Sequence, residues 1–179
     1  PYYQDAFEKD PENVVAVEGL CRIYENEGEL IEARNLIRNL HLNGYKDDDT
    51  GDLFTELNKK IIGEFEQKSN KEALDDMYLL QIADTYFMEE NTQKSKEIME
   101  LIDIDNEIDV FYYYMLSKIY LDMKKCDKSL EYLNLWEDAI KNSSKEKLQR
   151  INHRCTSMHE LYICKSIFDW ERKDSSSAL

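Results

Sequence analysis

Residues 79–102 read LLQIADTYFMEENTQKSKEIMELI, and residues 113–136 read YYMLSKIYLDMKKCDKSLEYLNLW. Aligned at an offset of 34 residues, the two stretches match as large apolar, large apolar, small, tyrosine, small, large apolar, large apolar. The matched positions are Leu79, Ile82, Ala83, Tyr86, Ser95, Met99 and Ile102 in the first stretch, and Tyr113, Leu116, Ser117, Tyr120, Ser129, Leu133 and Trp136 in the second. Two unrelated helices would rarely agree over so long a series, so the chain contains an internal repeat.

A third copy of the pattern lies nearer the N-terminus. Its matching positions are Val17, Leu20, Cys21, Tyr24, Gly28, Ala33, Ile37 and Leu40. Gly28 also provides a turn between two helices. Residues 1–12 match the second helix of a preceding unit, so we expect the sequence to begin inside a repeat.

The pattern resembles the tetratricopeptide repeat, a helix–turn–helix unit of 34 residues. The small–Tyr–Gly–small series from Cys21 to Ala33 is its best-preserved part, whereas the later copies have Glu90 and Lys124 where the family has a turn glycine. The resemblance implies an all-α fold: a right-handed superhelical solenoid of antiparallel helix pairs with a concave inner face. The small residues are predicted to lie where the two helices of a pair approach closely, because only small side chains fit there.

The composition independently favours an all-helical chain. Five glycines and two prolines among 179 residues are few for folds that need many turns. No apolar run approaches the roughly 20 residues that span a bilayer. The cysteines are widely spaced and are interpreted as free thiols of a reducing compartment, so we expect an intracellular protein, cytoplasmic or nuclear. They are Cys21, Cys126, Cys155 and Cys164.

The repeat register also predicts the domain organisation. We expect a repeat array over residues 1–142 and a long C-terminal capping helix over residues 144–174, with Ser144 as its N-cap and a tail over residues 175–179. The units of the array are 1–12 (partial), 14–45, 46–75, 76–107 and 110–142. The register fails in the third of these, where apolar spacing still predicts a helix. A degenerate unit is favoured there over an insertion.

The charge of the chain restricts its partners. The net charge is −15, and residues 1–110 alone have 28 acidic and 11 basic side chains, whereas residues 111–179 have 10 and 12. Such a surface repels phosphate backbones and anionic lipid, so nucleic acid and membrane are not expected as partners. A protein or peptide is the expected partner, and a basic one fits this charge.

No catalytic motif is present, and we expect neither enzymatic activity nor a cofactor. The acidic series that begins at Asp103 has the spacing of a calcium loop at its start. That loop requires glycine at its sixth position and glutamate at its twelfth, and these are Ile108 and Tyr114 here. We therefore expect an inter-repeat loop and no metal site.

By resemblance to the family, a partner would bind the inner surface formed by the first helix of each pair. The corresponding positions are Arg22, Met77, Leu80, Asp84, Phe87, Phe111, Tyr114, Lys118 and Leu121. Phe87 and Tyr114 are expected to project into this groove, whereas Tyr86 and Tyr120 are expected in the core. Apolar and aromatic anchors with charged neighbours suit an extended or helical peptide.

Some members of the family bind the C-terminal carboxylates of heat-shock chaperones through inner-face Lys, Asn and Arg side chains. Here Arg22 and Lys118 are isolated cations, and Asp84 stands where an asparagine would be needed. Binding of chaperone tails is therefore disfavoured.

The sequence thus predicts a non-enzymatic scaffold or adaptor module, part of a larger protein or complex, that holds a partner segment in its concave groove. One alternative is an acidic assembly chaperone that shields a basic client protein. Another is a peptide-sensing regulatory domain whose superhelical pitch changes on binding. Salt dependence distinguishes the first alternative, since exposed charge pairs are screened at high ionic strength. Compaction on peptide addition distinguishes the second.

Overall fold

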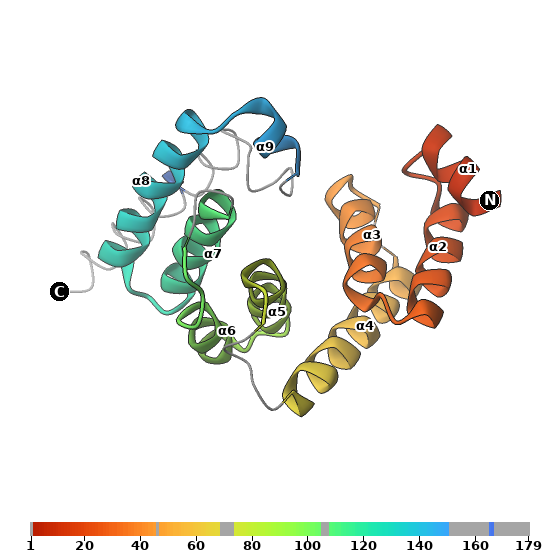
Figure 1. The fold of residues 1–179 in the computed structure, drawn as a ribbon, viewed down its shortest axis with the longest axis horizontal. Coiled ribbons are helices and arrows are strands. Elements are labelled where there is room, and N and C mark those ends of the chain that lie inside the picture. The colour runs from red at the N-terminus through yellow and green to blue at the C-terminus, as the bar shows by residue number, and fades with distance from the viewer. Residues whose placement is uncertain (1, 46, 69–73, 105–107, 151–164, 167–179) are drawn as a thin grey trace. The chain divides into compact units, whose positions relative to one another are not determined.

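The computed structural model describes residues 2–45, 47–68, 74–104, 108–150 and 165–166. Within these ranges the regular secondary structure is α-helical and no strand is present (Figure 1). The chain divides into two compact units, which we call unit 1 (Pro1–Ser69) and unit 2 (Asn70–Leu179). The expected all-α class is confirmed for the described residues.

Among its described residues, unit 1 has four helices, each packed against the next in the chain (Figure 1). They are α1 (Tyr2–Lys9), α2 (Val14–Glu27), α3 (Leu30–Leu42) and α4 (Asp48–Gln67). The Asn13 side chain caps α2 by accepting a hydrogen bond from the Ala16 N–H at 3.0 Å. This supports a helix start just after residue 13, close to the start expected for the second unit.

The contact between α1 and α2 depends on a glycine. A Cβ atom at Gly19 would lie well inside van der Waals contact with the ring of Tyr3. The ring can therefore rest on the backbone of α2 only because residue 19 has no side chain. This contact positions α1, which has no fully buried residue of its own.

The described part of residues 46–75 holds one 20-residue helix, α4, and no helix pair. Its N-terminus has a capping box: the Asp47 side chain accepts from the Thr50 N–H at 2.9 Å, and the Thr50 hydroxyl accepts from the Asp47 N–H at 3.2 Å. Further along, the Lys60 ammonium of α4 pairs with the Glu25 carboxylate of α2, 35 residues earlier. The helix expected in this range is present as α4.

The part of unit 2 that the structure describes up to residue 150 holds two helix pairs followed by a further helix. The pairs are α5 (Asp76–Met88) with α6 (Thr92–Met99) and α7 (Asp109–Asp122) with α8 (Cys126–Asn142), and α9 (Lys145–Arg150) comes next. The two pairs contact each other because α7 packs against both α5 and α6.

Within each helix pair of unit 2, a hydrogen bond at the same repeat position joins the second helix to the first. In α5–α6 the Ser95 hydroxyl donates to the Ala83 carbonyl oxygen at 2.7 Å, and in α7–α8 the Ser129 hydroxyl donates to the Ser117 carbonyl oxygen at 2.9 Å. All four residues are buried. The prediction that these small residues lie where paired helices approach is confirmed.

The α2–α3 pair has a hydrogen bond between the same two repeat positions, with the donor on the other helix. The Cys21 thiol donates to the Ala33 carbonyl oxygen at 3.0 Å, and both residues are buried. The alanine side chain has no hydrogen-bond donor, so the donor at this helix crossing is on the first helix. The first-helix position is again a small residue, as the sequence predicted.

The turns of the three pairs share one backbone conformation. Gly28, Glu90 and Lys124 all have positive φ, of 82°, 59° and 59°. In each turn the following N–H bonds back to the carbonyl of the repeat tyrosine, as in a Schellman motif. These bonds are Glu29 N to Tyr24 O at 2.8 Å, Asn91 N to Tyr86 O at 2.9 Å and Lys125 N to Tyr120 O at 2.9 Å. The departure from glycine in the later copies therefore leaves the turn geometry unchanged.

The start of the expected C-terminal helix is present as α9. The Ser144 hydroxyl accepts from the Lys147 N–H at 3.2 Å, so the predicted N-cap is confirmed. The Lys147 ammonium also pairs with the Asp109 carboxylate at the start of α7, at 2.5 Å. Residues 151–164 and 167–179, which contain most of the expected capping helix and the tail, lie outside the described residues.

Candidate partner-binding surface

The nine predicted groove residues fall into two separate sets. Arg22 is in α2 of unit 1, and the other eight are in α5 and α7 of unit 2. Within unit 2, the α5 positions recur in α7 at an interval of 34 residues. The α5 residues are Met77, Leu80, Asp84 and Phe87, and their equivalents in α7 are Phe111, Tyr114, Lys118 and Leu121.

Four of these residues are not at the surface. Leu80, Asp84, Phe111 and Tyr114 are buried, none of them more than 4% exposed. The Tyr114 ring packs edge-on against the ring of Trp136, with centroids 4.9 Å apart. The expectation that these four side chains line an open groove, and that Tyr114 projects into it, is therefore wrong.

The physical reason is that α7 is covered on several sides. It packs against α5, α6 and α8, and Leu80 and Asp84 at the equivalent positions of α5 are buried as well. A sequence signal for this was available, since α7 has large apolar residues all round its circumference and such a helix is buried. They are Val110, Phe111, Tyr114, Met115, Leu116, Ile119 and Tyr120.

Five of the nine remain accessible. Arg22 and Met77 are exposed, and Phe87, Lys118 and Leu121 are half-buried. Phe87 and Leu121 occupy equivalent places in the last turns of α5 and α7, which pack together. These two apolar side chains, together with Lys118 one turn before Leu121 and Met77 in the first turn of α5, are what unit 2 retains of the predicted inner surface.

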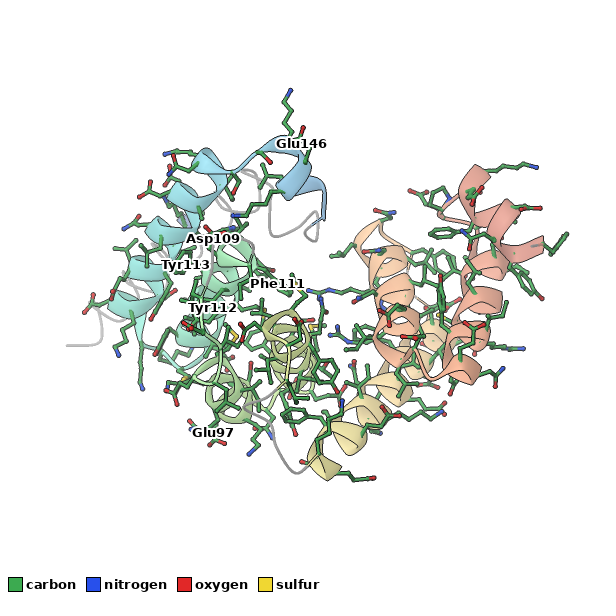
Figure 2. All side chains as sticks on the ribbon, in the orientation of Figure 1. Glu97, Asp109, Phe111, Tyr112, Tyr113 and Glu146 are labelled. Carbon is green, nitrogen blue, oxygen red and sulfur yellow. The ribbon has the colours of Figure 1, made fainter. Side chains whose placement is uncertain are left out.

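Tyr86 and Tyr120 are buried, so the prediction that they belong to the core is confirmed. Tyr120 stacks on Tyr132 of α8 with centroids 5.4 Å apart and an interplanar angle of 4°, and Tyr132 in turn faces Tyr113 at 6.4 Å. Figure 2 labels Tyr113 beside Tyr112, whose ring meets it edge-on at 5.9 Å. The tyrosines therefore join α7 to α8 as packing residues.

Burial keeps two ionisable groups of the described chain in their neutral forms, the Tyr112 phenol of α7 and the Cys21 thiol of α2. Burial raises the pKa of the Tyr112 phenol to about 12, and it raises the pKa of the Cys21 thiol to about 12. Both groups stay protonated at neutral pH, and a thiol is a poor nucleophile in that form. Among the described residues no group of three or more His, Cys, Asp or Glu side chains could hold a metal ion.

In unit 1, charged side chains of α2 and α4 pair with each other one turn after Arg22 of α2. Lys60 contacts both Glu25 of α2 and Glu56 of its own helix. The hydrogen bond to Glu25, and to a smaller extent the one to Glu56, raises the pKa of Lys60. The three side chains are partly exposed, so the pairs add little stability.

Comparison with known proteins gave no match: no protein-family model, no curated protein and no solved structure matches the chain. Within the described ranges, no helix combines the length and the apolar character needed to cross a membrane.

Proposed function

We propose that the chain is a non-enzymatic protein-interaction scaffold or adaptor of the tetratricopeptide type, which holds a segment of a partner protein against the inner helices of stacked pairs. The observation that supports it is the equivalence of α5–α6 and α7–α8. The two pairs share a serine-to-carbonyl bond at the crossing, a positive-φ turn and an interval of 34 residues. Repeats of this kind stack into right-handed superhelical solenoids that bind partners on a concave face.

The accessible residues suit such a partner. Phe87 and Leu121 offer apolar contact area, and Lys118 offers a cation beside them. Aromatic and apolar side chains with a polar rim are typical of surfaces that bind peptides. The two free cysteines of the described chain, Cys21 and Cys126, favour a reducing compartment, so a cytoplasmic or nuclear location belongs to the proposal.

An affinity capture with matched variants tests this function. The wild-type chain, Leu121→Ala and Leu135→Ala would be immobilised and the captured proteins identified by mass spectrometry. Leu135 is the control, because it is an exposed leucine on α8, outside the predicted inner face. A partner retained by Leu135→Ala and lost by Leu121→Ala supports the proposal. Equal loss from both variants, or capture of no protein by the wild type, contradicts it.

A second candidate is an acidic assembly chaperone for a basic client, favoured by the excess of acids in residues 1–110. Its binding would depend on many charge pairs, so affinity would collapse between low salt and about 0.5 M salt. Binding through apolar side chains would be retained. Repeating the capture at both salt concentrations distinguishes the two functions.

A further inference from the structure

One end of unit 2 brings together the first turn of α5 and residues 101–104, which follow α6. The Asp103 N–H donates to the Asp76 carboxylate at 3.4 Å, although the two residues are 27 positions apart. This contact places residues 101–104 next to the start of α5.

Three large apolar side chains are exposed at this end. Met77 of α5 is 37% exposed, and Leu101 and Ile104 after α6 are 37% and 41% exposed. Ile102 between them is buried, which anchors this stretch to the unit while its neighbours face outward. We call Met77, Leu101 and Ile104 the end patch. Exposed apolar residues that gather in one place commonly mark an interaction site.

Carboxylates adjoin the end patch in the chain, since Asp75 and Asp76 precede Met77 and Asp103 precedes Ile104. Asp75 and Asp103 are exposed and Asp76 is half-buried. In the ranges that the structure describes, no cation pairs with any of the three, whereas the nearby lysines of α6 pair with other acids. Those pairs are Lys94 with Glu97 and Lys96 with Glu100. The rim of the end patch is therefore negative.

We propose that the end patch docks a basic amphipathic segment of a partner protein. Its apolar side chains would cover Met77, Leu101 and Ile104, and its Lys or Arg side chains would reach Asp75 and Asp103. The carboxylates repel nucleic acid and anionic lipid, so a protein segment is the occupant that the charge fits. The inference rests on one part of the proposed function, the binding of a protein partner, and not on the inner face. It adds a second surface, at the opposite end of α5 from Phe87.

A model peptide tests the proposal directly. The probe is a synthetic amphipathic helix of leucine and lysine, roughly 14 residues or about four turns long. Two comparison peptides replace either every leucine by serine or every lysine by glutamate. Fluorescence anisotropy with the full chain should show binding of the leucine–lysine peptide and far weaker binding of both comparison peptides. Equal binding of the serine–lysine peptide would mean charge attraction alone, and the proposal would be overturned.

Variants locate the binding. Met77→Ser and Ile104→Ser should each weaken the leucine–lysine peptide at least about fivefold, as loss of an anchor does. Met88→Ser is the matched control, since Met88 is 46% exposed at the far end of the same helix. It should leave affinity unchanged. Equal weakening by Met88→Ser, or no binding by the wild type, overturns the proposal.

The same variants separate this inference from the proposed function. With a partner obtained by affinity capture, loss of binding in Phe87→Ala and full retention in Met77→Ser and Ile104→Ser would leave the scaffold function standing and reject the end patch. Loss in Met77→Ser and Ile104→Ser supports the end patch. If the peptide binds the end patch while no partner protein depends on Phe87 or Leu121, the proposed inner-face function fails and the docking inference stands.

Discussion

The Ser129 hydroxyl donates a hydrogen bond of 2.9 Å to the carbonyl oxygen of Ser117, on the opposite helix of its pair. The same bond recurs 34 residues earlier, from Ser95 to Ala83. The repeat found in the letters of the sequence therefore corresponds to a repeated contact between helices.

Removing this bond should destabilise unit 2 by a modest amount. We expect Ser129→Ala to lower the free energy of unfolding by about 1 kcal/mol, because one buried hydrogen bond is lost and no large cavity forms. Ser129→Val should cost more, about 1–3 kcal/mol, since the site is closely packed. Chemical denaturation measures both. Ser143→Ala is the control: its hydroxyl bonds within its own helix at a half-buried position, and the change should stay within about 0.5 kcal/mol. Equal effects at residues 129 and 143 would contradict the assignment.

The turns offer a prediction of the opposite sign. Glu90 and Lys124 have φ of 59°, a conformation that costs side-chain-bearing residues about 1 kcal/mol. Glu90→Gly and Lys124→Gly should therefore each raise the free energy of unfolding by about 0.5–1 kcal/mol. Gly28→Ala should lower it by a similar amount, and only through the backbone, because a Cβ there would meet no atom within 4 Å. Thermal melts of the three variants check these signs. Destabilisation by both Glu90→Gly and Lys124→Gly would mean that the Glu90 and Lys124 side chains make contacts that offset the cost of the positive φ.

The start of α8 lacks a side-chain cap that its equivalent has. Asn91 caps α6 by accepting from the Lys94 N–H at 3.1 Å, whereas Lys125 has the same backbone (φ −98°, ψ 67°, against −95° and 64°) and no capping side chain. Lys125→Asn should add about 1 kcal/mol of stability. The reverse change, Asn91→Lys, should remove about as much. If Lys125→Asn has no effect in denaturant titrations while Asn91→Lys destabilises, the two helix starts are not equivalent.

The sequence analysis assigned Phe87 and Tyr114 to one groove, but their different burial predicts that alanine substitution lowers the free energy of unfolding by different amounts. Tyr114→Ala should destabilise the chain by about 3–5 kcal/mol, as truncation of a buried aromatic does. Phe87→Ala should cost less, because that ring is half-buried. Tyr120→Ala is the control for a buried tyrosine and should resemble Tyr114→Ala. Melting temperatures rank the three variants. A Tyr114→Ala variant as stable as the wild type would mean that Tyr114 is not buried.

The positions of helix pairs and crossings could be predicted because they depend on residue size at a fixed interval. Ser95, Ser129 and Ala33 are small where helices touch, and no other property of the fold is needed to place them. Which side chains are exposed to solvent could not be predicted from residue size at a fixed interval. Whether Tyr114 is covered depends on how many neighbours α7 has, which is a property of three other helices. For the same reason only Met77 of the end patch was predicted as a binding residue: Asp103 and Asp76 meet through a loop whose path has no periodic pattern.

The contact between Tyr3 and Gly19 links a local detail to the state of a whole helix. An isolated segment as short as α1 is not stably helical in water, because too few hydrogen bonds offset the cost of nucleation. Its eight residues are helical while they are packed on α2. Any side chain at residue 19 would displace the Tyr3 ring, and the segment would lose a contact that holds it on α2. The helix–coil equilibrium of residues 2–9 is thus governed by a residue outside that segment.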